Sequence, residues 1–320
     1  MSGVTIGIDV GGTKIQAAAM RSGRVAGGHR LATPQSGADD VAAAIVEATA
    51  KALAEAGAAV PDIGAVGIGF PGSIDRETGT VAHSPNVPGF KAREPIPLAS
   101  MVSEALGGVP VELDNDVRVA VLGEWKRGAG RGFGNLLGVW VGTGVGGGLV
   151  LDGKLYQGEG AAGEIGHTIV KAGGRVCSDG RKGHLEAYAG RGQIEVEARA
   201  RVRHGQKTIL FELMEKKGRT RLSSGVIAAA LEKKDKMTVE LIDDAVWALG
   251  VGLASVQNLL AFEAIVIGGG LGDRLGPPFV MRIEEEMLPL LFVPDRPPKL
   301  LTTEFGDLSG AVGAAVLAGG

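Results

Sequence analysis

Cysteine, aromatic residues and excess charge of either sign are scarce in this chain of 320 residues. Cys177 is the only cysteine, so no disulfide can form within the chain, which favours a reducing compartment. Lys and Arg total 33 against 36 Asp and Glu, and the net charge of -3 provides no basic field for nucleic acid or anionic lipid. Aromatic residues make up only 4%, which leaves few surfaces on which bases could stack. These shortages argue against a nucleic-acid-binding protein.

Long uninterrupted hydrophobic runs are missing as well. The first residues hold no basic segment followed by an apolar one, and the longest uncharged run, residues 132–151, is broken by glycine. We therefore expect a cytoplasmic protein without a targeting or membrane-spanning segment. Hydrophobic residues still make up 45% of the chain, enough for a sizeable core, and the length predicts one or two domains.

Glycine is abundant, with 54 residues that follow no three-residue period. Glycines follow a predicted buried strand in three places, at residues 11–12, 142–148 and 268–270. The first two groups each lie between two predicted strands, which are 4–10 and 14–20 in the first case and 136–141 and 149–151 in the second. A pattern of strand, glycine turn and strand that recurs in each half of the chain predicts a duplicated α/β unit.

Three polar residues follow directly after one of the predicted strands. Apolar spacing predicts helices over residues 36–56 and 238–262, and β-rich runs predict strands over 65–70 and 109–113. Asp114, Asn115 and Asp116 directly follow the last of these strands. Because open α/β sheets bind ligands at the carboxyl ends of their strands, this position is a candidate for a site, with Asp114 expected to be structural.

The glycine groups differ from the common nucleotide-binding loops. Gly142, Gly144 and Gly147 satisfy a G-x-G-x-x-G string, but no helix is predicted directly after it, and the chain has no Gly-Lys-Ser or Gly-Lys-Thr triplet of a P-loop. Backbone N–H groups of tight turns bind phosphate oxygens, although a single glycine turn also serves simply to reverse the chain. Asp9 precedes the first group and is a carboxylate suited to holding Mg²⁺ beside phosphates.

The order of these motifs resembles a known family. DVGGTK at residues 9–14, GTGVGGG at 142–148, GEIGH at 163–167 and the glycines at 268–270 resemble the signatures of the ROK family of sugar kinases and related repressors. The resemblance covers nearly the whole chain and implies an α/β, two-lobed, actin-like (ribonuclease H-like) ATPase fold with a central cleft. We expect a small N-terminal lobe of residues 1–117 plus about 306–320, and a large C-terminal lobe of residues 118–305.

The resemblance implies ATP-dependent phosphorylation of a hexose hydroxyl, with glucose to glucose 6-phosphate as the favoured reaction, Mg²⁺ as cofactor and a homodimer as the assembly. Kinases for N-acetylmannosamine, N-acetylglucosamine, fructose or allose remain alternatives. A sugar-responsive transcriptional regulator of the same family is a further alternative. Such regulators carry a helix-turn-helix domain ahead of the first glycine motif, and since eight residues precede Asp9, we expect none here.

The resemblance also implies roles for individual residues. Asp116 matches the catalytic base, which accepts the proton of the attacking sugar hydroxyl, a role that phosphoryl transfer requires. The positions that match sugar contacts are Asn86, Asn115, Asp116, Glu164, His167 and Glu186. The positions that match nucleotide contacts are Asp9, Gly11, Gly12, Thr13, Lys14, Thr143, Gly144, Gly146, Gly268, Gly269 and Gly270.

Two stretches depart from the family pattern. Members commonly bind zinc through a histidine and a Cys-x-Cys-Gly-x-x-Gly-Cys string, whereas this chain reads CSDGRKGHLE, so that His167, Cys177, Asp179 and His184 take the ligand positions. Zinc accepts these donor types, but the same residues also suit a loop without metal. Val117 and Arg118 stand where members usually have small or polar residues. For Arg118 we expect either a charge on the helix surface or a side chain that reaches the cleft.

Overall fold

A computed structural model describes residues 3–84, 86–91 and 94–319, which form two compact units. Unit 1 contains Met1–Gly132, Gln157–Gly160 and Asp307–Gly320, and unit 2 contains Phe133–Tyr156 and Ala161–Gly306. Unit 1 extends past the boundary at residue 117 that we expected, because helix α3 (Asp116–Arg127) packs on helix α10 (Ser309–Leu317) within this unit.

Unit 1 is built on a mixed sheet in the order β3-β2-β1-β4-β7. The first three strands in this order pair antiparallel, and β1, β4 and β7 run parallel. The bounds are β1 (Val4–Val10), β2 (Lys14–Arg21), β3 (Arg24–Ala32), β4 (Ile63–Phe70) and β7 (Val111–Asn115). A separate hairpin joins β5 (Ser73–Asp75) and β6 (Thr80–His83).

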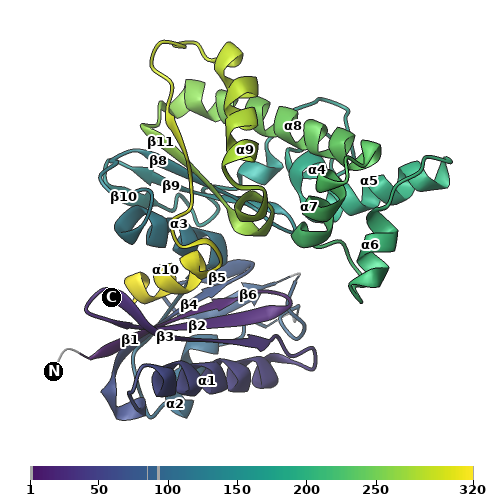
Figure 1. Cartoon of the computed structure of the whole chain (residues 1–320). Helices are drawn as coiled ribbons and strands as arrows, with labels where there is room; N and C mark the ends of the chain where they lie inside the picture. Colours follow the sequence, from purple (N-terminus) through teal and green to yellow (C-terminus); the bar gives the residue numbers. More distant parts are fainter. Residues whose placement is uncertain (1–2, 85, 92–93, 320) are drawn as a thin grey trace. The chain divides into compact units, whose positions relative to one another are not determined.

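Helices cover both faces of the unit 1 sheet. The helices α1 (Ala38–Glu55) and α2 (Leu98–Ala105) lie on one face, and α10 and α3 lie on the other (Figure 1). Helix α10 lies directly on the backbone of two strands, since a Cβ at Gly7 would be 1.8 Å from the carbonyl oxygen of Ala311, and one at Gly67 would be 1.7 Å from that of Ala314. The glycines of β1 and β4 are therefore needed for close contact between helix and sheet.

Unit 2 repeats the same topology with a sheet in the order β10-β9-β8-β11-β12. The strands β10, β9 and β8 pair antiparallel, and β8, β11 and β12 run parallel. The bounds are β8 (Leu136–Val141), β9 (Val145–Leu151), β10 (Lys154–Tyr156), β11 (Ala264–Gly268) and β12 (Lys299–Thr302). Within the described chain the two sheets thus share one strand order and one pattern of directions, and the predicted duplication is confirmed.

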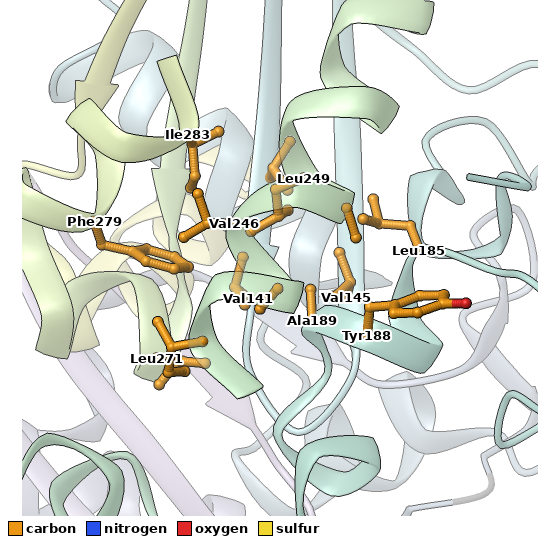
Figure 2. Packing of buried hydrophobic residues seen from close by; sticks show 14 of the residues in the cluster. Val141, Val145, Leu185, Tyr188, Ala189, Val246, Leu249, Leu271, Phe279 and Ile283 are labelled. Carbon is orange, nitrogen blue, oxygen red and sulfur yellow. The ribbon is translucent and has the colours of Figure 1, made fainter. Parts of the chain in front are cut away.

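The helices of unit 2 enclose its core. Their bounds are α4 (Glu186–Ala189), α5 (Arg191–Arg203), α6 (Leu210–Lys216), α7 (Ser224–Glu232), α8 (Lys236–Leu260) and α9 (Gly269–Met287). Figure 2 shows Phe279 and Ile283 of α9 beside Val246 and Leu249 of α8, and all four side chains are buried. The predicted helix over residues 238–262 is confirmed, because its apolar spacing buries one face against this core.

Short 3₁₀ turns complete the described elements, at Val60–Asp62, Ile165–His167, Leu288–Leu290 and Gly306–Leu308. Helix α9 is kinked at Gly276, which has a φ of 61° and precedes Pro277 and Pro278. In the part of the chain that the structure describes, no helix combines the length and apolar character needed to cross a membrane.

Candidate active site

The loop between β7 and α3 fixes the position of Asp116. Asn115 ends β7 and caps α3, because its side-chain oxygen accepts hydrogen bonds from the backbone N–H groups of Val117 (3.0 Å) and Arg118 (3.2 Å). The Asn115 amide nitrogen also donates to the carbonyl oxygen of Gly72 at 3.4 Å. Asp116 is half-buried as the first residue of the capped helix. The cap therefore holds this carboxylate at a defined position at the end of a strand.

The parallel register brings Asp9 to the same sheet edge. Asp9 pairs with Gly69 of β4, and Gly69 pairs with Asp114 of β7. The carboxyl ends of β1 and β7 are therefore separated by one strand, which corresponds to about 10 Å between their axes. Unit 1 thus presents Asp9 and the Asn115 and Asp116 pair along a single edge.

The first glycine turn links β1 to β2. The backbone N–H of Gly11 donates to the carbonyl oxygen of Lys14 at 2.8 Å, which closes a tight turn around Gly12 and Thr13. A Cβ at Gly12 would lie 2.7 Å from the carbonyl oxygen of Asn86, so the turn packs directly on the Asn86 segment. Unit 1 therefore brings its predicted phosphate turn and one predicted sugar contact together.

Asp9 has an unusual electrostatic environment. Its carboxyl group lies against the start of α10, where a Cβ at Gly310 would be 2.5 Å from the Asp9 Cγ. Burial raises the pKa of Asp9 from 3.8 to about 6; Lys14 opposes this shift and Asp307 adds to it. Lys14 pairs with Asp307 (Nζ to Oδ1, 3.1 Å), an acid 293 residues away that we did not predict. No local pattern could have shown this pair, because only the fold brings the 3₁₀ turn Gly306–Leu308, which contains Asp307, to the first glycine turn.

Arg118 is buried, so the expectation of a charge on the helix surface was wrong. The residue is 5% exposed, with Nη2 at 2.8 Å from Asp114 Oδ1 and Nη1 donating to the carbonyl oxygen of Gly160 at 2.9 Å. Arg76 approaches the other Asp114 oxygen at 3.4 Å. The surface-charge prediction was wrong because helical spacing alone did not show that this face of α3 packs inward. The bond to Gly160 joins α3 to residues 157–160 within unit 1.

Replacing Arg118 with Met should destabilise unit 1, because Arg76 would then be the one described cation paired with the fully buried Asp114 carboxylate. Removing one partner of a buried ion pair typically costs about 3–5 kcal/mol. Urea unfolding of Arg118→Met should show a loss of that order. The double variant Asp114→Asn with Arg118→Met is the control, and it should lose less than Arg118→Met alone. Equal losses in both proteins would contradict the pair as the cause.

The second glycine turn, in unit 2, is shorter than predicted. The N–H of Gly142 donates to the carbonyl oxygen of Gly144 at 2.9 Å, and β9 begins at Val145, so Gly146 lies in a strand and pairs with Trp140. A Cβ at Gly144 would be 2.2 Å from Glu186 Oε2, which also accepts a hydrogen bond from the Val145 N–H at 2.9 Å. The turn therefore packs directly on the Glu186 carboxylate.

The third glycine group joins β11 to α9. Gly268 ends the strand, and Gly269, with a φ of 82°, begins the helix. We predicted only a strand closed by glycines, so the helix start was missed. The sequence signal for this helix was weak, because Pro277 and Pro278 interrupt its apolar spacing.

The remaining predicted sugar contacts lie in unit 2. Glu164 precedes the 3₁₀ turn Ile165–His167, and its carboxylate is exposed at 4.0 Å from His167 Nε2. Glu186 begins α4, and its Oε1 accepts a hydrogen bond from the Ser178 hydroxyl at 2.6 Å. Asn86, Asn115 and Asp116 belong to unit 1.

Four side chains of unit 2 converge into a set of potential metal ligands. One donor atom from each of His167, Cys177, Asp179 and His184 lies within 4.8 Å of all the others. Asp179 Oδ2 is 3.4 Å from Nδ1 of each histidine. A hydrogen bond from the Arg181 N–H lowers the pKa of Asp179, and burial raises the pKa of the Cys177 thiol. Two imidazoles, a sulfur and a carboxylate are a donor set that fits tetrahedral zinc.

The repeated five-stranded topology defines the class of this protein, which is the actin-like (ribonuclease H-like) ATPase fold that we expected. The chain belongs to the ROK family, whose sequence profile matches residues 5–320. It is 34% identical over 291 residues to a glucokinase of Halalkalibacterium halodurans, covering 89% of this chain and 86% of the relative. It is 33% identical to the glucokinase of Streptomyces coelicolor, covering 99% and 98%.

The fold also matches a solved structure of a ROK family glucokinase from Streptomyces griseus in complex with glucose and AMPPNP. The TM-score is 0.82 at 32% identity, and the match covers 99% of both chains. The likeness therefore spans both units.

Proposed function

We propose that this chain is an ATP-dependent sugar kinase that transfers the γ-phosphoryl group of ATP to glucose and forms glucose 6-phosphate. The observation that carries the proposal is the capped position of Asp116 at the end of β7, at the same sheet edge as Asp9 and the first glycine turn. The glucokinases that match nearly the full chain favour glucose as the acceptor.

Asp116 is the general base in this proposal. Its carboxylate accepts the proton of the attacking hydroxyl, while the polar residues around the sugar hold that hydroxyl in line with the phosphate. The sugar contacts are Asn86, Asn115, Glu164, His167 and Glu186. The tight turns support the nucleotide role, because they present backbone N–H groups to phosphate oxygens. The nucleotide contacts are Asp9, Gly11, Gly12, Thr13, Lys14, Thr143, Gly144, Gly146, Gly268, Gly269 and Gly270.

Asp9 is the residue that would hold Mg²⁺. A carboxylate at the end of β1 offers the hard oxygen ligand that this ion prefers, and the bound ion would neutralise charge on the donor phosphates. Burial raises the pKa of Asp9 and so opposes the ionised form in the ligand-free protein, and a bound cation would offset that cost.

The test is a panel of acceptors assayed by coupled ADP release. Glucose should give the highest kcat/KM, and glucose 6-phosphate should be the product. A higher kcat/KM with N-acetylmannosamine, N-acetylglucosamine, fructose or allose would reassign the acceptor within the kinase class. Sugar-phosphate formation with polyphosphate in place of ATP tests the donor. A shift of promoter DNA that glucose reverses, without ADP release, would instead support the regulator.

We propose that His167, Cys177, Asp179 and His184 hold a structural zinc ion. Protein purified without chelators should contain about one equivalent of zinc, because the four donors complete a tetrahedral site. The Cys177→Ser and Asp179→Asn variants should lose the metal and unfold at a lower temperature. The His204→Ala variant, a change outside the cluster, should keep the zinc and unfold at the wild-type temperature. Elemental analysis and thermal unfolding measure the two effects. Wild-type protein free of zinc would overturn the assignment.

We further propose a cytoplasmic homodimer, since ATP is an intracellular donor and the family resemblance implies a dimer. Exposed apolar side chains in unit 2 support an interface there. Phe292 is 85% exposed and Leu259 is 79% exposed, and the Phe292 N–H donates to Asn258 beside Leu259 at 2.8 Å. Light scattering of the wild type and of Phe292→Ser tests this, and a monomeric wild type at micromolar concentration would contradict it.

A further inference from the structure

Arg191 has an unusual set of partners for a half-buried arginine. It is the first residue of α5 in unit 2, and its guanidinium donates to two hydroxyl groups, Thr143 Oγ1 at 2.8 Å and Ser224 Oγ at 3.3 Å. Among the residues that the structure describes, no carboxylate oxygen lies within 4.0 Å of the Arg191 guanidinium. Glu195, one turn along α5, is instead bound to Arg199 at 2.7 Å and to the Leu222 N–H at 2.9 Å.

The side chain lies between the two glycine segments of unit 2. The backbone N–H of Arg191 donates to the carbonyl oxygen of Gly142 at 3.0 Å, and that of Gly192 donates to Thr143 at 2.9 Å. On the other side, a Cβ at Gly270 would be 3.8 Å from Arg191 Nη1. Arg191 therefore connects the turn after β8 with the glycines that begin α9.

The charge of this group is not balanced by its neighbours. Burial lowers the pKa of Arg191, and the nearby Arg221 lowers it further, while Glu195 opposes both. A guanidinium carries five N–H donors, and the two hydroxyls leave several of them available. A partly buried cation without a carboxylate is costly unless an anion completes its surroundings. The planar guanidinium is especially suited to phosphate.

We propose that Arg191 binds the phosphate tail of the nucleotide donor and holds the Thr143 turn against it. The anion class is a nucleoside triphosphate, or an inorganic polyphosphate if that is the donor. This inference rests on the proposed kinase function. It adds a cationic side chain to the nucleotide contacts proposed in unit 2, which are otherwise glycines and the Thr143 hydroxyl. The Arg191 side chain raises the affinity for the donor phosphates and does not contact the sugar.

The test compares Arg191→Met, Arg191→Gln and Arg191→Lys with wild type. Loss of a charge-assisted phosphate contact should raise the KM for ATP by on the order of 10- to 100-fold in the Met and Gln variants, with the KM for glucose within about twofold. Arg191→Lys should recover part of the affinity, because it restores the charge without the planar donors. Arg203→Met is the matched control, since Arg203 is exposed at the far end of the same helix.

Direct titration calorimetry separates a binding role from a structural one. ATP and inorganic tripolyphosphate should bind Arg191→Met more weakly than wild type, while adenosine binds both equally. An unchanged ATP affinity in a variant that unfolds at a lower temperature would overturn the inference and leave the kinase assignment standing. A wild-type protein that binds tripolyphosphate but phosphorylates no sugar would overturn the proposed function alone. Arg191→Lys supplies the same comparison if the larger changes prevent folding.

Discussion

Asp116→Asn should lower kcat for glucose phosphorylation by on the order of 10²- to 10⁴-fold, the usual worth of general-base catalysis. Asparagine has nearly the same shape as aspartate but cannot accept the proton of the attacking hydroxyl. The Asn115 cap should remain, because its bonds go to the backbone N–H groups of Val117 and Arg118. The KM for glucose should therefore change by only a few fold, and the loss should fall on turnover.

The measurement is coupled ADP release for turnover and calorimetry for glucose binding. Asp152→Asn is a suitable control, since Asp152 lies in the turn between β9 and β10 with a φ of 49°, a conformation that asparagine also tolerates. Asp152→Asn should match wild type in both measurements. If Asp116→Asn turns over within a few fold of wild type, another group accepts the proton and the assignment of the base fails.

Much of the fold was predictable because its signals are local. The runs 4–10 and 136–141 are apolar, β-branched and bounded by glycine, and both became central strands of their sheets. The predicted helix over 36–56 was observed as α1 (Ala38–Glu55), where Ile45 and Ala48 are among the buried residues. Since the same order of elements occurs twice, each half supported the interpretation of the other.

Features of the fold that depend on packing between distant segments could not be predicted from the sequence. The predicted turn at 142–148 is mostly strand, and Gly147 explains why the pattern misled: a Cβ there would lie 2.7 Å from the carbonyl oxygen of Gly163, so this glycine serves packing and not a turn. Arg118, Asp307 and Arg191 took partners 42, 293 and 48 residues away, respectively. Residue spacing along the chain contains no information about such pairs.

In the candidate site, too, the residues within local motifs were predictable, and those brought in from distant segments were not. Family motifs indicated Asp9, Asn115 and Asp116, and the parallel register of β1, β4 and β7 explains why the two segments reach one edge. The motifs did not indicate the residues that tune them, because these come from elements that the fold brings in from elsewhere. Asp307 shapes the charge around Asp9, and Ser178 holds Glu186.

The Asp9→Asn variant should lose activity without losing stability at neutral pH. We expect kcat/KM to fall by at least about 100-fold, since a neutral amide is a poor ligand for Mg²⁺ beside the phosphates. Raising the Mg²⁺ concentration should recover part of this loss if Asp9 holds the ion. A variant with wild-type activity at low Mg²⁺ would exclude Asp9 from that role.

The same change should not destabilise the ligand-free protein at neutral pH. Because the pKa of Asp9 is raised from 3.8 to about 6 on folding, the folded state keeps a proton that the unfolded state has already lost, so wild-type stability falls as pH rises through that window. The cost above pH 6 is at most about 3 kcal/mol. The neutral amide of the Asp9→Asn variant carries no such cost, so urea unfolding without divalent cations should show the variant gaining on wild type between pH 4 and pH 7. A constant difference between the two proteins across this range would mean that the carboxyl group titrates normally in the fold, and that burial at the start of α10 does not oppose its charge.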